Sequence, residues 1–226
     1  MPTYNEMGPL TQTVEAVFQV APDLDLLIID DNSPDGTGDL ADLLANKHPQ
    51  LRVLHRQAKQ GLGRAYIAGF EWAIENGYDY IVQMDADGSH RPDDLPLVVE
   101  AAAENRLVIG SRWVPGGAVL NWPWYRQWIS RAGNLYARLT LRSHVKDITA
   151  GFRCYPVSFL TGLELELFRA QGYGFQIEMT KLAQDRGVVV EEVPITFVER
   201  ESGVSKMTYK IIFEAFWLCT KWAFRR

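Results

Sequence analysis

The sequence has little cysteine, no excess of basic residues and no long apolar run, and each absence excludes a class of protein. Its two cysteines, Cys154 and Cys219, lie far apart and lack the spacing of metal ligands. A disulfide-stabilised secreted domain is therefore excluded, and free thiols in a reducing compartment are expected. The net charge of −5 argues against a general nucleic-acid binder, because phosphate contacts need an excess of Lys and Arg.

Hydrophobic residues make up 47% of the chain, but they occur in short runs. No run reaches the roughly 18–20 apolar residues that a membrane span needs, and no signal-peptide pattern is found. The length of 226 residues is enough for one sizeable core, and no low-complexity break or internal repeat divides it. We therefore expect a single domain. The aromatic content of 12% is high and indicates an apolar surface or pocket.

The first half of the chain alternates between short apolar runs and helical patterns. The runs lie at 26–29, 52–54, 80–84 and 107–109, and the helical patterns lie at 9–20, 38–47, 61–76 and 93–105. This alternation predicts an α/β fold with a mostly parallel, Rossmann-like sheet flanked by helices. Ligands of such sheets bind beyond the carboxyl ends of the strands. The residues that fall at those ends are Asp30, Asp31, Asp85, Asp87, Ser111 and Arg112.

The second half begins with a segment rich in Gly, Trp, Arg and Pro at 115–135. We predict helices near 155–168 and 175–186, a strand at 188–197, a polar loop at 199–205 and a last helix at Tyr209–Phe224. At the other end of the chain, residues 2–6 have the pattern of a loop that follows a strand. We therefore expect a first strand in front of residue 1.

The run Asp85-Ala86-Asp87-Gly88-Ser89-His90 is the most informative motif. Two carboxylates one residue apart at a strand end form a compact group of hard ligands, which suits Mg²⁺ or Mn²⁺ bound to phosphate oxygens. The alternative is that both acids are simply solvated. His90 would then pack or support the ligands, and Ser89 would start a helix.

Three acids lie in the turn at 30–37. They can bind a nucleobase or a ribose, or they can serve only as turn and helix-capping residues.

Gly61-Leu62-Gly63 lacks a preceding strand and a third glycine, so it predicts the start of a helix rather than a dinucleotide site. Cations follow in the second half, where they can bind phosphates: Arg112, Arg126, Arg131, Arg153, Arg200 and Lys206. We interpret Arg126 as a surface charge. The helix Tyr209–Phe224 is nearly all apolar, so it packs in the core or lies in a membrane interface.

Seven motifs occur in an order that resembles one enzyme family. They are residues 2–6, 30–37, Asp85-Ala86-Asp87, Gly110-Ser111-Arg112, Asn121-Trp122-Pro123, residues 147–153 and residues 194–206. In this order the chain resembles the dolichyl-phosphate or polyprenyl-phosphate mannose synthases of glycosyltransferase family 2, especially the actinobacterial polyprenol monophosphomannose synthases. The resemblance covers essentially the whole chain. It implies one GT-A domain over residues 1–226, with an amphipathic C-terminal helix at 206–226.

The resemblance also implies the reaction and its residues. Mannose would pass from GDP-mannose to a polyprenyl phosphate with inversion, giving β-mannosyl phosphoryl polyprenol and GDP, with Mg²⁺ or Mn²⁺ as cofactor. The implied nucleotide-sugar contacts are Pro2, Tyr4, Glu6, Asp31 or Asp30, Asp85, Ala86 and Asp87. Asp87 would bind the metal together with Ser89, where some relatives have Gln. Arg112 and Arg131 would bind the acceptor phosphate, and Arg200 and Lys206 would contact both the diphosphate and the acceptor.

The nucleophile in this reaction is an anionic phosphate oxygen, so no strong general base is required. Asp147 occupies the place where related hydroxyl-accepting enzymes keep a base, and we expect it to orient the sugar or the arginines. The predicted catalytic residues are Asp87, Arg112, Arg131, Asp147, Arg200 and Lys206.

We expect peripheral attachment to the cytoplasmic face of a membrane, through Tyr209–Phe224 and residues 113–128. A membrane subunit or a fused membrane domain is a further expected partner, and nucleic acid is not. Two alternatives stay open: a UDP-glucose-dependent polyprenyl-phosphate glucosyltransferase, and a non-catalytic subunit that binds nucleotide-sugars.

Overall fold

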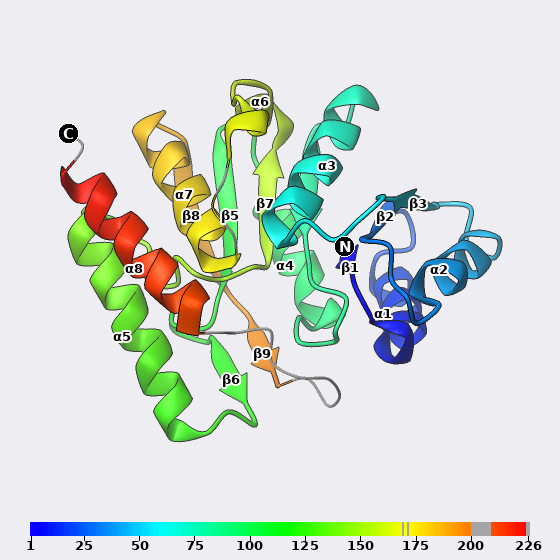
Figure 1. Cartoon of the computed structure of the whole chain (residues 1–226), viewed down its shortest axis with the longest axis horizontal. Helices are drawn as coiled ribbons and strands as arrows, with labels where there is room; N and C mark the ends of the chain where they lie inside the picture. The colour runs from blue at the N-terminus through cyan, green and yellow to red at the C-terminus, as the bar shows by residue number, and fades with distance from the viewer. Residues whose placement is uncertain (169, 171, 200–208, 225–226) are drawn as a thin grey trace.

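The computed structural model describes residues 1–168, 170, 172–199 and 209–224, with side chains in the last range given for 216–223. Figure 1 shows a central sheet with strand order β4-β7-β5-β8 and a parallel sheet, β1-β2-β3, on one side of it. A small sheet of β6 and β9 lies at the edge below the central sheet. Helices cover these sheets, so the predicted single α/β domain with a mostly parallel sheet is confirmed.

The parallel sheet is formed by β1 (Pro2–Thr3), β2 (Leu26–Asp30) and β3 (Leu51–His55). The helices α1 (Met7–Val20) and α2 (Thr37–Ala45) connect and cover these strands. The apolar run of β2 is almost wholly buried, as expected for a strand that is covered on both faces. Pro2 and Thr3 pair with Ile29 and Asp30, so the loop at residues 4–6 does follow a strand. That more of this strand precedes residue 1 stays a prediction.

The central sheet consists of β4 (Tyr80–Gln83), β5 (Arg106–Ser111), β7 (Arg153–Pro156) and β8 (Val189–Pro194). The strand β7 is antiparallel to both β4 and β5, whereas β5 and β8 are parallel. The helix predicted near 155–168 is confirmed only in part: β7 extends to Pro156, and two short helices follow, α6 (Val157–Thr161) and η2 (Leu165–Leu167). Tertiary contacts explain this, because the fully buried Arg153 guanidinium donates to the carbonyls of Ala150, Ile148 and Gln176.

The remaining helices are α3 (Leu62–Glu75), η1 (Pro92–Asp94), α4 (Leu95–Glu100), α5 (Trp124–Leu141), α7 (Gly172–Asp185) and α8 (Tyr209–Phe224). The start of α3 confirms the interpretation of the glycine pair, since Gly61 has a φ of 98° directly before the helix. The helix α5 was not predicted. The predicted strand at 188–197 is divided after Pro194, because β9 (Thr196–Val198) pairs with β6 (Ala118–Leu120) instead of the central sheet.

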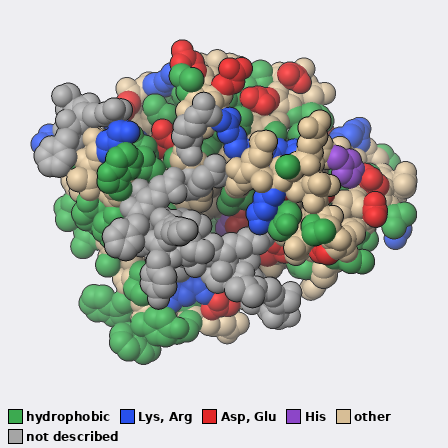
Figure 2. Space-filling view, in the orientation of Figure 1, with side chains coloured by type: hydrophobic (Ala, Val, Ile, Leu, Met, Phe, Trp, Pro, Cys, Tyr) green, Lys and Arg blue, Asp and Glu red, His purple; other side chains and the backbone are tan. Residues whose placement is uncertain are grey.

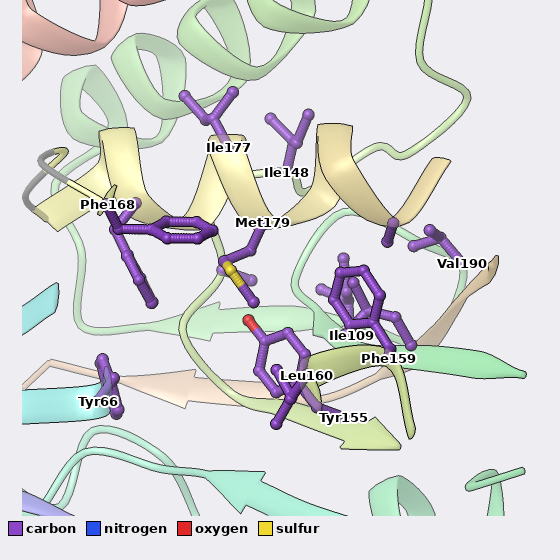
Figure 3. Close-up of a cluster of buried hydrophobic side chains, with 14 of the residues drawn as sticks. Tyr66, Ile109, Ile148, Tyr155, Phe159, Leu160, Phe168, Ile177, Met179 and Val190 are labelled. Atoms are coloured by element: carbon purple, nitrogen blue, oxygen red, sulfur yellow. The ribbon is translucent and has the colours of Figure 1, made fainter. Parts of the chain in front are cut away.

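The larger hydrophobic core lies between the central sheet and the helices α3, α5, α6 and α7, and Figure 3 shows part of it. Phe70, Phe168 and Phe175 pack there with Tyr66 and Tyr155. Both cysteines are buried and free, which confirms the prediction of unpaired thiols. Within the part of the chain that the structure describes, no helix combines the length and hydrophobicity that crossing a bilayer requires.

Candidate functional site

A cavity of about 520 Å³ lies at the carboxyl ends of β1, β2, β4 and β5. Nine of the predicted site residues line it: Pro2, Tyr4, Glu6, Asp31, Asp85, Ala86, Asp87, Ser89 and Arg112. Trp122 and Thr149, which belong to two of the seven motifs, also line it, together with residues that the sequence did not single out, among them Lys59, Gln60 and Tyr173. Asp31, Asp85, Asp87 and Arg112, which the sequence places at the carboxyl ends of strands, therefore line one cavity, because these strand ends lie side by side in the folded sheet.

The two aspartates after β4 are held by different neighbours. The Oδ1 atom of Asp85 accepts a hydrogen bond of 2.6 Å from the Tyr66 hydroxyl, and the Asp85 N–H donates to Nδ1 of His90 at 3.0 Å. The Oδ1 atom of Asp87 accepts from both the N–H and the hydroxyl of Ser89, at 3.0 and 2.5 Å. His90 is buried and stacks on Phe152, so it supports this loop from behind.

These residues fit a divalent metal that is completed by substrate. Among the described residues, no group of three or more His, Cys, Asp and Glu side chains is placed to hold a metal by itself. Mg²⁺ commonly takes only one or two carboxylates and completes its shell with phosphate oxygens and water. Asp87 and Asp85 supply this partial set. Because the Ser89 hydroxyl is buried and donates to Asp87, Ser89 orients Asp87 here, and its role as a metal ligand stays a prediction.

At the end of the cavity near the N-terminus, Asp31 and Asp30 have separate roles. The carboxylate of Asp31 lines the cavity and forms an ion pair with Arg56, a residue that the sequence did not single out. Burial raises the pKa of Asp31, and Arg56 offsets part of this rise. Asp30 is buried behind it and accepts hydrogen bonds from Thr3 and Ser33, so it stabilises the turn and is not among the residues that line the cavity.

Two further contacts lie at the end of the cavity near Asp31. The Arg56 guanidinium also donates to Oε1 of Gln60 at 3.0 Å, and the ammonium of Lys59 lies 3.7 Å from the centre of the Tyr4 ring. All of Tyr4, Lys59 and Gln60 line the cavity. An aromatic ring, a buried carboxylate and a cation thus lie together at the end of β2.

At the other end of the cavity, Arg112 forms a buried ion pair with Asp147. The guanidinium donates through Nε and Nη2 to the two oxygens of Asp147, each at 2.7 Å, and the Arg112 N–H donates at 2.9 Å. Burial alone would lower the pKa of Arg112, but Asp147 raises it above its ordinary value. The loop that carries Asp147 is fixed in turn by Glu192, whose carboxylate accepts the N–H of Lys146 and of Asp147. Asp147 thus orients an arginine, as one of its two predicted roles requires.

Arg126 also belongs to this end, and its interpretation as a surface charge is wrong. It lines the cavity, its guanidinium lies 4.2 Å from the centre of the Trp122 ring, and it forms an ion pair with Glu199. The segment that would have indicated this is Trp122-Pro123, because α5 begins directly after the proline and so holds residue 126 in its first turn.

Arg131 is not among the described residues that line the cavity, and its contact with the acceptor stays a prediction. It is an exposed residue of α5 whose guanidinium lies 4.4 Å from the centre of the Trp113 ring. Five residues along an α-helix amount to a rotation of about 500°, so Arg126 and Arg131 point in directions about 140° apart. Of the other predicted cations, Arg200 and Lys206 lie outside the described residues.

A smaller, apolar groove of about 80 Å³ adjoins the cavity. The two share Trp122, Arg126, Thr149 and Tyr173, and the groove continues between α5, α7 and α8 along Ile129, Gly133, Ala137, Ile177, Phe216 and Cys219. Carboxylates therefore lie at one part of the site, guanidinium groups at another, and apolar side chains beyond the guanidinium groups. This order suits a reaction between two anions, one of which carries an apolar chain.

Comparisons with known proteins agree with this arrangement. Residues 1–162 match the family described as Glycosyl transferase family 2. The chain is 51% identical over 222 residues to the undecaprenyl-phosphate mannosyltransferase of Micrococcus luteus, covering 98% of this chain and 91% of that protein. It is 48% identical over 227 residues to the polyprenol monophosphomannose synthase of Mycolicibacterium smegmatis, covering 100% of this chain and 86% of that protein.

Solved structures with a similar fold include glucosyl-3-phosphoglycerate synthase from Mycobacterium tuberculosis. Its complex with Mn²⁺, UDP-glucose and phosphoglyceric acid superposes with a TM-score of 0.69 at 20% identity, covering 96% of this chain and 77% of that one. Its complex with Mg²⁺ and UDP gives a TM-score of 0.67 at 19% identity, with the same coverage. The likeness shows that the fold is the predicted GT-A fold.

Proposed function

Because the chain belongs to glycosyltransferase family 2, we propose that it transfers mannose from GDP-mannose to a polyprenyl phosphate, with inversion. The products would be β-mannosyl phosphoryl polyprenol and GDP. The observation that carries this proposal is that the cavity and the apolar groove share part of their wall. Arg126 and Trp122 line both the cavity, which the aspartates also line, and the apolar groove. The relatives named as mannosyltransferases of polyprenyl phosphates support it.

The donor would lie along the aspartate side of the cavity. A carboxylate can accept the N–H groups on one edge of guanine, and Asp31 is a buried carboxylate that lines the cavity. Tyr4 supplies an aromatic face for the base, and Asp85 and Asp87 lie where the diphosphate and sugar would follow.

A divalent metal, Mg²⁺ or Mn²⁺, would be held by Asp87 with Asp85 nearby, and when bound it would neutralise charge on the leaving diphosphate. The protein's own residues would orient the aspartates and supply positive charge. Asp85 and Asp87 are oriented by Tyr66 and Ser89, and Arg126 brings a positive charge to the acceptor side. In the proposed complex these residues would hold the two anions for in-line displacement.

The acceptor phosphate would lie near Arg126 and Arg112, with its first isoprenoid units in the apolar groove. An acceptor phosphate oxygen attacks C1 of mannose, the bond from C1 to the diphosphate oxygen breaks, and GDP leaves with that electron pair. No proton has to be removed from the nucleophile. Asp147 is therefore free to serve as the partner of Arg112 instead of as a base.

The first test is a transfer assay with radiolabelled GDP-mannose or UDP-glucose and a short-chain polyprenyl phosphate, with and without EDTA. We expect labelled lipid from GDP-mannose only, and loss of product with EDTA. Labelled lipid from UDP-glucose alone would support the glucosyltransferase alternative, and no transfer from either donor would support a non-catalytic subunit.

The same assay tests the acceptor side with Arg126→Gln and Arg131→Gln. Losing a hydrogen bond between a guanidinium and a phosphate costs about 1.5–3 kcal/mol, so R126Q is expected to lower kcat/KM for the acceptor roughly 10–100-fold. R131Q is the comparison on the same helix, and we expect it to have the smaller effect. A larger loss in R131Q than in R126Q would contradict the placement of the acceptor.

We also propose that the exposed face of α5 binds the membrane surface from which the acceptor is taken. Trp124 and Trp128 are 72% and 71% exposed, and Tyr125, Ile129, Leu135 and Leu139 are also exposed on this helix. Figure 2 shows hydrophobic side chains gathered at the lower left, over the first turns of α5. Trp, Tyr and Arg together are typical of helices at a membrane interface.

Replacing both tryptophans, in Trp124→Gln with Trp128→Gln, is expected to lower binding to polyprenyl-phosphate-containing vesicles in a flotation assay by about tenfold or more. Transfer to a short, water-soluble acceptor should be unchanged. The matched control replaces two exposed leucines outside α5, Leu43→Gln with Leu97→Gln. Equal vesicle binding by the wild type and the tryptophan variant would contradict this role.

A further inference from the structure

Tyr66 reaches the site from the hydrophobic core. It lies on α3, it is 3% exposed, and its ring stacks on Phe175 with the ring centres 6.1 Å apart. In Figure 3 it lies at one side of the core cluster. Its hydroxyl donates the hydrogen bond of 2.6 Å to Oδ1 of Asp85. A core residue thus contacts the first aspartate of the motif directly.

The other contacts of Asp85 leave its second oxygen on the cavity side. Its N–H is held by Nδ1 of His90, which places the proton of the neutral imidazole on Nε2. The Oδ2 atom lies 4.0 Å from the same His90 nitrogen and 3.9 Å from where a Cβ on Gly151, a residue that lines the cavity, would stand. Oδ1 is therefore held by the core residue Tyr66, and Oδ2 lies beside a residue of the cavity wall.

Among the described residues, the side chains that form hydrogen bonds with Asp85 are the Tyr66 phenol and the His90 imidazole, which acts as an acceptor. The Tyr66 phenol donates its hydroxyl hydrogen to Asp85 and brings no positive charge to the carboxylate. Arg112 and Asp147 show the opposite arrangement, in which a carboxylate is matched by a full positive charge. A carboxylate held only by neutral groups keeps its attraction for a bound cation or for substrate hydroxyl groups.

We propose that Tyr66 is a positioning residue that holds the Asp85 carboxylate with one oxygen towards the donor substrate; this inference rests on the proposed function. Without the phenol oxygen, the carboxylate can rotate about its side-chain bonds, and the oxygen facing the cavity is no longer fixed. The donor and its metal would then bind to a side chain that becomes ordered only on binding, and the free energy of ordering it would weaken their affinity.

Tyr66→Phe removes one oxygen atom and keeps the ring in the core. Binding of GDP-mannose without acceptor, measured by calorimetry in the presence of Mn²⁺, is expected to weaken about tenfold in Y66F. The Mn²⁺ concentration that gives half-maximal binding should rise in parallel. Tyr78→Phe is the matched control, because the Tyr78 hydroxyl also donates to a carboxylate, Asp25, but at an exposed position. We expect Y78F to bind like the wild type.

A double-mutant cycle separates positioning from a general structural effect. If Tyr66 acts through Asp85, Y66F is costly in the wild type and has little further effect on binding in Asp85→Asn. Wild-type affinity and Mn²⁺ dependence in Y66F would overturn the inference, as would an equal loss in both backgrounds. A wild-type protein that binds no GDP-mannose would instead contradict the proposed function.

Discussion

Replacing Asp87 by Asn is expected to lower turnover by at least about 10²–10³-fold, which is the effect of removing one preorganised group that stabilises developing charge. Asn has the same size and keeps an oxygen for Ser89, so the loop after β4 should keep its conformation. What is lost is the negative charge that would hold the metal at the leaving diphosphate. The measurement is mannosyl transfer at saturating GDP-mannose, with Mn²⁺ binding followed separately by electron paramagnetic resonance.

Asp93→Asn is the control for this variant. Asp93 lies six residues further along, is exposed, and forms an ion pair with Arg91 outside the cavity. Exposed pairs of this kind contribute little, so D93N should keep the turnover and the Mn²⁺ affinity of the wild type. Turnover in D87N at the wild-type level, with unchanged Mn²⁺ binding, would rule out Asp87 as a metal ligand.

The proposed donor half of the site could be predicted from sequence because its residues follow short apolar strands. The runs that end at β2 and β4 are short and apolar, and the acids come directly after them, so one rule about sheet edges places Asp31, Asp85 and Asp87 together. The same rule cannot separate Asp30 from Asp31. Adjacent residues of a strand point to opposite faces, and only the fold shows that the cavity lies on the side of Asp31.

The acceptor half depends on contacts that no local pattern contains. The helix α5 has a polar and aromatic sequence with few buried residues, and the direction of each arginine depends on where this helix begins. Where α5 begins therefore determines that Arg126, and not Arg131, lines the cavity. The strand β7 is a similar case, since its own buried residues Arg153 and Tyr155 contact other segments, at Gln176 and Phe70. Arg56 was missed because Asp31, the carboxylate with which it forms an ion pair, lies 25 residues earlier in the chain.

Removing the charge of Asp147 is expected to destabilise the whole domain. Asp147 is fully buried, and Asp147→Asn leaves the buried Arg112 guanidinium without a counter-charge. Breaking a buried pair in this way costs about 3–5 kcal/mol of unfolding free energy. For a chain of this length each kcal/mol corresponds to roughly 2–4 °C, so the melting temperature should fall by roughly 6–20 °C. Differential scanning calorimetry measures this shift. Asp185→Asn, which breaks an exposed pair with Lys181, should lower it by no more than about 2 °C.

Combining Asp147→Asn with Arg112→Gln separates stability from activity. The double variant has no unpaired buried charge, so it should recover much of the lost melting temperature. It should not recover transfer to polyprenyl phosphate, because the guanidinium that Asp147 holds at the acceptor side is absent. Recovery of both properties would mean that the pair serves only the stability of the fold. Recovery of stability alone would show that the sequence keeps a costly buried ion pair because its arginine is needed at the acceptor phosphate.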